Sequence, residues 1–160
     1  MASSRRKTIE QLLAQARSRL ARLDATAAAA ALSDGALLID IRSESQRATD
    51  GVVAGALFFP RNILEWRCDP SSPSRDPRIA PDRQLILMCD EGYQSSLAAA
   101  TLQELGLGKA TDLVGGFQAW RAAGLATERL AAGSLPVGPK RIGPRLRPSR
   151  SAVRRARSSR

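Results

Sequence analysis

Aromatic residues make up only 4% of the 160-residue chain, and cysteine occurs only twice, at Cys68 and Cys89. Packing must therefore rest on Leu, Ile, Val and Ala. Two cysteines exclude a disulfide framework, and their separation excludes a C-x-x-C redox pair, so a reducing cytoplasm is the expected compartment. No apolar run approaches the roughly eighteen residues that a membrane span needs, and residues 1–7 are not followed by the apolar core of a secretory signal. We therefore expect a cytoplasmic protein without a membrane span.

Acidic residues are absent from positions 139–160, which hold nine of the 25 lysines and arginines. The remaining sixteen basic residues face fifteen acidic ones, so nine of the ten net positive charges lie in residues 139–160. Pro, Gly, Ser and Arg dominate residues 129–160 without hydrophobic periodicity, which predicts a disordered tail. The tail is either a solvated, solubilising segment or a nucleic-acid arm, and without aromatic residues for base stacking its contact with nucleic acid would be weak and electrostatic.

Apolar residues keep helical spacing near the N-terminus, at Ile9, Leu12, Leu13, Ala16, Leu20 and Leu23. This pattern predicts an amphipathic helix within residues 1–25, from about Thr8 to Leu23, with Arg17, Arg19 and Arg22 in solvent. Such a helix either packs on the domain, docks a partner or lies on a membrane surface. A second, alanine-rich helix capped by Asp24 or Thr26 follows, and it opens a domain over residues 26–128.

Short apolar runs near residues 36–41, 56–59, 84–88 and 111–114 alternate with helical segments. This alternation predicts the α/β class: a single doubly wound domain with a short, mostly parallel central sheet and helices on both faces. Phe117 and Trp120 share one helix face and are expected in the core. Residues 68–81 contain four prolines and three serines, which predicts a surface loop with Cys68 exposed or half-exposed.

Cys89 follows the four-residue apolar run 85–88 directly and precedes a polar loop and an alanine-rich helix. A helix opened by Ser95 or Ser96 as N-cap would turn unpaired N–H groups and the positive end of its dipole toward the loop centre. Such a cradle favours an anionic sulfur, the form in which cysteine acts as a nucleophile. The alternative is a buried cysteine that serves only as a small core residue. Gly92 and the polar pair Asp90 and Glu91 favour the reactive loop.

The pattern Cys89-x-x-Gly92-x-x-Ser95 after an apolar strand resembles the active-site loop of the rhodanese-like sulfurtransferase family in its single-domain form. Three further motifs fall in the family's order, at residues 37–42, at Gly55-Ala56 with Pro60, and at residues 113–120. Together the four motifs cover about residues 26 to 126.

This resemblance implies a sulfurtransferase without cofactor or metal, in which a Cys89 persulfide passes a sulfane sulfur from a small-molecule or protein donor to a thiol or cyanide acceptor. The implied active-site loop comprises Asp90, Glu91, Gly92, Tyr93, Gln94 and Ser95. Ser96 would support it with its hydroxyl, and Asp40 and Arg42 would brace loops beneath it as an internal ion pair. The resemblance also implies an added edge strand near the start of the domain, which periodicity does not show.

The chain departs from the family at two points. Gln94 stands where many members have an arginine, and the sequence contains no histidine, although many members place one shortly before the Gly-Ala pair. Asp90 and Glu91 would also repel doubly charged thiosulfate, which favours a persulfide donor.

Two other functions are possible for a cysteine loop of this kind. One is a catalytically weak rhodanese-like binding or redox-sensing module, in which Cys68 could serve as a resolving cysteine if the long loop folds over Cys89. The other is a phosphatase, which needs an arginine at the end of the cysteine loop. Gln94, Ser95 and Ser96 offer none.

Overall fold

A four-stranded parallel sheet forms the centre of the protein in a computed structural model that describes residues 6–131. Its strands are β1 (Leu37–Asp40), β2 (Leu57–Phe58), β3 (Leu85–Met88) and β4 (Ala110–Asp112), in the order β2-β1-β3-β4. Asp40 of β1 pairs with Met88 of β3, so both strands end at the same edge. Strands β1, β2 and β3 fall within the predicted runs, and β4 begins and ends earlier than its predicted run of 111–114. The predicted α/β class is confirmed.

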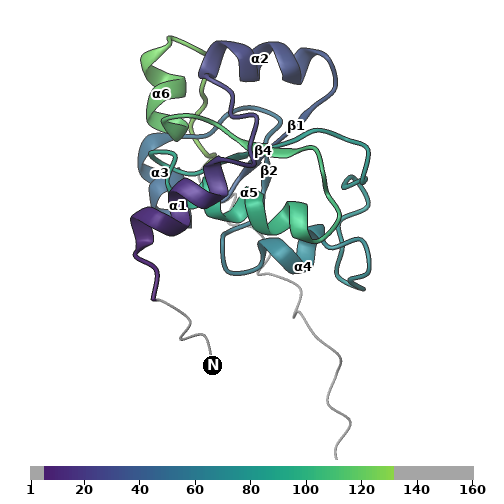
Figure 1. The fold of residues 1–160 in the computed structure, drawn as a ribbon. Coiled ribbons are helices and arrows are strands. Elements are labelled where there is room, and N and C mark those ends of the chain that lie inside the picture. The colour runs from purple at the N-terminus through teal and green to yellow at the C-terminus, as the bar shows by residue number, and fades with distance from the viewer. Residues whose placement is uncertain (1–5, 132–160) are drawn as a thin grey trace, which may run out of the picture.

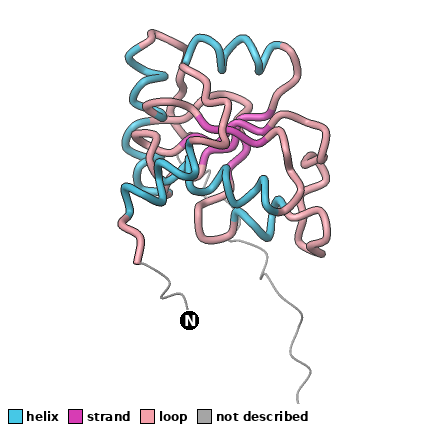
Figure 2. Tube along the Cα trace, viewed as in Figure 1, coloured by secondary structure: helices cyan, strands magenta, loops and turns pink. Residues whose placement is uncertain are grey.

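Helices cover both faces of the sheet (Figures 1 and 2). They are α1 (Ile9–Arg17), α2 (Ala25–Ser33), α3 (Glu44–Asp50), α4 (Leu64–Cys68), α5 (Gln94–Glu104) and α6 (Gly116–Ala122). In Figure 1, α2 and α6 lie above the sheet and α4 and α5 below it, with α1 beside α5. Between residues 6 and 131, no helix has the length and apolar composition needed to cross a membrane.

Helix α3 was not predicted from the sequence, although its N-terminus carries a recognisable signal. The Ser43 side chain accepts a hydrogen bond from the Gln46 N–H, and the Gln46 side chain accepts one from the Ser43 N–H. This capping box satisfies two otherwise unpaired donors and explains why so polar a segment starts a helix.

Strand β3 shows how one apolar run fills two cores. Leu85, Leu87 and the following Cys89 face a cluster with α4 and α5, whereas Ile86 and Met88 face a cluster with α2 and α6. The whole strand is buried because successive side chains point to opposite faces of a sheet covered on both sides. Phe117 and Trp120 belong to the second cluster, so their predicted place in the core is confirmed.

The N-terminal helix is shorter than its apolar pattern predicts. Helix α1 ends at Arg17, and Leu23 instead forms a parallel bridge with Leu113. The Leu23 N–H donates to the Asp112 carbonyl at 3.1 Å, and the Val114 N–H donates to the Leu23 carbonyl at 2.8 Å. Leu23 thus adds a one-residue edge beyond β4, in the region where the family resemblance implied an extra strand.

The expected exposure of Cys68 is wrong. Cys68 ends α4, is fully buried, and packs in the same cluster as Leu64 and Ile79. The proline-rich segment after it folds back, and the Asp76 N–H donates to the Arg67 carbonyl at 2.9 Å. Burial raises the pKa of the Cys68 thiol to about 12, with nearby Glu65 and Asp76 adding to the effect. Loop composition described the segment correctly but not the residue at its start.

The buried Asp76 carboxylate holds the proline-rich segment after Cys68 in place through hydrogen bonds. It accepts hydrogen bonds from Arg78 Nε at 2.9 Å and Nη2 at 2.8 Å, and from Arg67 Nη2 at 3.1 Å. The hydrogen bonds from the Arg78 side chain are the main reason that the pKa of Asp76 falls to about 2. A carboxyl whose pKa is lower in the folded than in the unfolded chain stabilises the fold while it is ionised.

We expect Asp76→Asn to lower the free energy of unfolding by about 1 kcal/mol near neutral pH, a modest value because the half-exposed Arg78 is screened by solvent. The contribution is complete above the unfolded pKa and is lost as the pH falls through about 2. The free energies of unfolding of the parent and the variant, measured by urea titration, should therefore differ near neutral pH and become equal in strong acid. A difference that grows on acidification would contradict this assignment.

Candidate active site

The Cys89 side chain is 2% exposed and lies just beyond the carboxyl end of β3. The loop that follows curls around it, so that the Gly92 N–H donates to Cys89 Sγ at 3.1 Å. Gly92 adopts φ +84°, and a Cβ there would lie 2.7 Å from the Gly115 nitrogen. Only glycine fits this tight approach, and its N–H is thereby aimed at the sulfur.

The predicted capping of α5 by Ser95 or Ser96 is wrong. Tyr93 occupies the N-cap position without a side-chain cap, and both serines lie buried in the first turn of the helix. Their hydroxyls donate to Asp112 Oδ2 at 2.9 Å from Ser95 and 2.7 Å from Ser96. Both serine hydroxyls thus donate hydrogen bonds to the buried Asp112 carboxylate at the end of β4. Neither serine oxygen caps the N–H groups at the start of α5.

Ser95 also contacts the sulfur. Its Oγ lies 3.2 Å from Cys89 Sγ, and in the thiol form Cys89 is the donor. Ser95 therefore stands between the sulfur and the Asp112 carboxylate. The three residues form a continuous hydrogen-bonded chain inside the protein.

Asp112 is the site residue that sequence reasoning missed. It closes β4 with 0% exposure, and its carboxylate accepts from Arg22 Nε at 2.8 Å and Arg22 Nη2 at 3.1 Å. The sequence held a signal for it, because a lone acid inside an otherwise buried strand must have a partner. The neighbouring parallel strand β3 ends just before Cys89, and this would have placed that acid near the loop.

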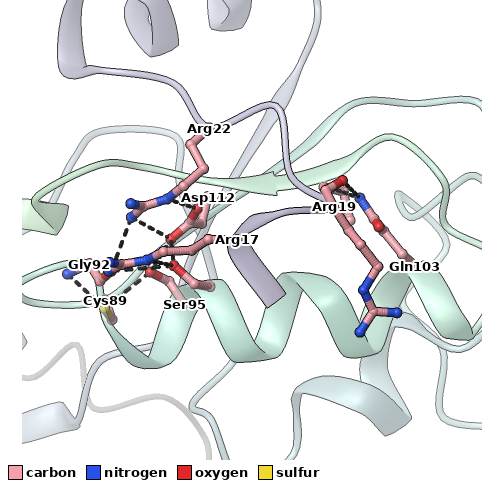
Figure 3. A network of polar contacts seen from close by, with 10 residues as sticks. Arg17, Arg19, Arg22, Cys89, Gly92, Ser95, Gln103 and Asp112 are labelled. Carbon is pink, nitrogen blue, oxygen red and sulfur yellow. Dashed lines mark hydrogen bonds and ion pairs between the residues drawn. The ribbon is translucent and has the colours of Figure 1, made fainter. Parts of the chain in front are cut away.

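Two of the three N-terminal arginines expected in solvent reach this loop instead (Figure 3). The Gly92 carbonyl accepts from Arg17 Nη2 at 2.8 Å and from Arg22 Nη2 at 3.1 Å. Arg17 Nε also donates to Ser96 Oγ at 3.1 Å. Arg19 is exposed, as predicted, and pairs with Glu104 at 3.2 Å. Of the apolar positions predicted in α1, Leu13 and Ala16 are buried, whereas Ile9 and Leu12 are exposed. Helical spacing also could not show where the long arginine side chains end.

The other loop side chains differ in exposure. Asp90 is half-buried, and its Oδ1 accepts from Gln118 Nε2 of α6 at 3.0 Å. Glu91, Tyr93 and Gln94 are exposed, with the Arg17 guanidinium 5.5 Å from the centre of the Tyr93 ring. The exposed residues are those that an approaching molecule would meet first.

Asp40 and Arg42 form the internal ion pair that their positions suggested. Arg42 Nη2 donates to Asp40 Oδ2 at 2.8 Å, and Arg47 Nε donates to the same oxygen at 3.1 Å. The Arg42 guanidinium stacks 3.7 Å from the centre of the Phe117 ring. Phe117 in turn donates its N–H to the Cys89 carbonyl at 2.9 Å. The pair therefore supports the loop through α6, with no hydrogen bond to the sulfur among residues 6–131.

Buried Cys68 should be chemically silent in the folded protein. With its pKa near 12, only about one thiol in 10⁵ is ionised at neutral pH. We expect iodoacetamide to modify Cys89 at least about tenfold faster than Cys68 in the native state, and both at similar rates in denaturant. Peptide mass mapping of partly alkylated protein measures the ratio. Equal labelling of the two cysteines in native protein would show that Cys68 is accessible.

A family model described as the rhodanese-like domain matches residues 24–123, which include β1 through α6 and the Cys89 loop. The chain belongs to the rhodanese-like domain family. A sulfurtransferase from Allochromatium vinosum is 32% identical over 93 residues, which is 58% of this chain and 78% of the relative.

Solved structures give the same assignment of fold. A Rhodopseudomonas palustris protein of unknown function, described as a possible tyrosine phosphatase, is 33% identical with a TM-score of 0.71, covering 80% of this chain and 99% of the other. A thiosulfate sulfurtransferase from Pseudomonas aeruginosa is 25% identical with a TM-score of 0.54, covering 68% of this chain and 19% of the other.

The rhodanese-like match does not include the whole hydrogen-bonded site. Cys89, Ser95 and Asp112 lie within residues 24–123, whereas Arg17 and Arg22 precede them. In this chain, the N-terminal segment therefore supplies two of the groups that hold the loop.

Proposed function

We propose that this rhodanese-like domain is a sulfurtransferase in which Cys89 carries the transferred sulfur as a persulfide. The observation that supports this most directly is the position of Cys89 Sγ, which receives the Gly92 N–H at 3.1 Å directly ahead of α5. A sulfur at the start of an eleven-residue helix meets the positive end of the helix dipole. This arrangement suits a nucleophile that carries negative charge before and after reaction.

Two displacements make up the proposed cycle. In the first, the Cys89 thiolate attacks the outer sulfur of the donor, the donor's S–S bond breaks, and its remainder leaves with the electron pair. In the second, a thiol or cyanide acceptor attacks the outer sulfur of the Cys89 persulfide, which restores the thiolate. With thiosulfate and cyanide, the released products are sulfite and thiocyanate, and no external oxidant is needed.

The charges of the loop favour a persulfide donor over thiosulfate. Glu91 is exposed beside the site, and the exposed Gln94 is neutral where many members of the family carry an arginine. Arg17 is engaged by the Gly92 carbonyl and Ser96, so it offsets the charge of Glu91 less directly than an arginine at position 94 would. A doubly charged donor approaching Glu91 therefore loses on the order of 1 kcal/mol of binding near a solvated surface. A persulfide on a protein or small thiol carries less charge at the reacting sulfur.

We expect Gln94→Arg to raise kcat/KM for thiosulfate about tenfold and to change kcat/KM for a persulfide donor by less than about threefold, since the added charge acts mainly on the dianion. The matched control is Glu104→Gln, which changes the charge by the same amount at the far end of α5. Steady-state assays with both donors measure the effect. A parent that already turns over thiosulfate with a low KM would refute the preference.

Neither a disulfide-based redox sensor nor a phosphatase gains support from the site. A sensor built on a Cys68–Cys89 disulfide needs an accessible, ionisable Cys68, whereas Cys68 is fully buried with a strongly raised pKa. Phosphoester hydrolysis needs an arginine within the cysteine loop, and residues 89–96 contain none.

The predicted nucleic-acid contact concerns the basic tail, whose residues from 132 onward lie outside the described part of the chain.

A further inference from the structure

Arg17 and Arg22 converge on the loop that holds Cys89, although both precede the residues matched by the family model. We propose that they are positioning residues for sulfur transfer. With Asp112 they hold the loop closed and leave the Ser95 hydroxyl able to bind an anionic sulfur. The proposal rests on the proposed role of Cys89 as the sulfur carrier.

Asp112 is the centre of this arrangement because its buried carboxylate accepts four hydrogen bonds. Two come from Arg22, at 2.8 and 3.1 Å, and one each comes from Ser95 and Ser96. The bidentate arginine neutralises the carboxylate, which would otherwise be a buried, unpaired charge. One of the four bonds can therefore be given up without leaving Asp112 unsatisfied.

Ser95 is the donor that can be released. Its hydroxyl has a single hydrogen, which bonds to Asp112 while the Cys89 thiol donates to Ser95 Oγ. Once the thiol proton is lost to solvent, the sulfur becomes an acceptor 3.2 Å from Ser95 Oγ. Rotation about the Cβ–Oγ bond then turns the hydroxyl hydrogen from Asp112 to the sulfur. Asp112 keeps Ser96 and both bonds from Arg22.

Arg17 holds the other side of the loop. Its Nη2 donates to the Gly92 carbonyl at 2.8 Å, and the N–H of the same glycine donates to Cys89 Sγ at 3.1 Å. Its Nε donates to Ser96 Oγ at 3.1 Å, which keeps Ser96 beside Asp112. Fixing the glycine carbonyl thus fixes the direction of a donor to the sulfur before any substrate binds.

The test compares Arg22→Met, Arg22→Lys and Arg17→Met with Arg19→Met in the full chain. Arg19 lies in the same segment but points away from Cys89 in Figure 3 and pairs with exposed Glu104, so it controls for the loss of one positive charge. Three quantities are measured for each variant: kcat and KM with a persulfide donor, the pH midpoint of Cys89 alkylation by iodoacetamide, and the melting temperature.

We expect Arg22→Met to lower kcat about tenfold or more and to raise the pH midpoint by about one unit, with little change in KM. Arg17→Met should lower kcat about threefold and shift the midpoint in the same direction, and Arg22→Lys should fall between Arg22→Met and the parent. Arg19→Met should stay within about twofold of the parent.

If Arg22→Met does not fold, the proposal is tested by the two milder variants. Half-exposed Arg17 does not contact Asp112, so Arg17→Met leaves the buried carboxylate paired, and Arg22→Lys keeps the positive charge beside it. Variants that match Arg19→Met in kcat and pH midpoint, or that lose activity only in step with melting temperature, would overturn the proposal. A parent without any sulfur transfer would instead refute the proposed function. The alkylation midpoints would then still show whether the arginines act on the sulfur.

Discussion

Alanine in place of Gly116 is expected to lower the free energy of unfolding by about 3 kcal/mol or more and to reduce sulfur transfer at least about tenfold. Gly116 adopts φ +60°, and a Cβ there would lie 2.5 Å from the carbonyl oxygens of both Cys89 and Asp90. Those carbonyls accept from the Phe117 and Gln118 N–H groups at 2.9 and 3.1 Å. The methyl group would therefore push the start of α6 away from the backbone that presents the sulfur.

Gly124→Ala is the matched control for this prediction. Gly124 follows the same helix with φ +73°, but a Cβ there would meet nothing within 4 Å. Gly124→Ala should therefore lower the free energy of unfolding by only about 1 kcal/mol, the cost of placing alanine in a left-handed backbone conformation, because its methyl group meets no carbonyl oxygen. Urea unfolding and a persulfide-transfer assay on both variants separate the two effects. Equal losses in the two variants would show that close packing at Gly116 is unimportant.

Replacing Cys89 with serine is expected to lower turnover with any sulfur donor by roughly a thousandfold or more. The serine oxygen is a poor nucleophile toward sulfur and cannot form a persulfide. The fold should persist, because the substitution keeps the size of the side chain and a hydroxyl can still contact Gly92 and Ser95.

Cys68→Ala serves as the control for the catalytic substitution. Cys68 packs in the apolar cluster with Leu64 and Ile79 and makes no contact on which the proposed chemistry depends. The kcat of Cys68→Ala should therefore stay within about twofold of the parent value, despite some loss of stability. Circular dichroism and steady-state kinetics on both variants are the measurements. Substantial turnover by the serine variant would move the chemistry away from Cys89.

The positions of the strands could be predicted from the sequence because the signals that mark a strand are local. The run Leu85–Met88 is apolar throughout, which a strand covered on both faces requires, and the polar residues after Cys89 mark where the chain leaves the core. The short strand at Leu57–Phe58 was found between a glycine-flanked turn and Pro60. Helix α3 was missed because its capping box lies in a wholly polar segment.

The hydrogen-bond partners of the site residues could not be predicted from the sequence, because they come from distant parts of the chain. Arg22 precedes Asp112 by ninety positions, and nothing in the periodicity of the N-terminal helix distinguishes it from exposed Arg19. Ser95 resembles a helix cap in sequence, yet it donates to Asp112 because the two residues meet across the sheet edge. Cys68 was placed in a loop by its prolines, although folding buries it beneath that loop.

Intact-protein mass spectrometry after treatment with a persulfide donor tests the central claim most directly. The parent and Cys68→Ala should gain the mass of one sulfur atom, which cyanide should remove, and Cys89→Ser should gain none. A sulfur adduct that persists in Cys89→Ser, or a parent that gains no sulfur while Cys89 remains alkylatable, would contradict the assignment of Cys89 as the sulfur carrier.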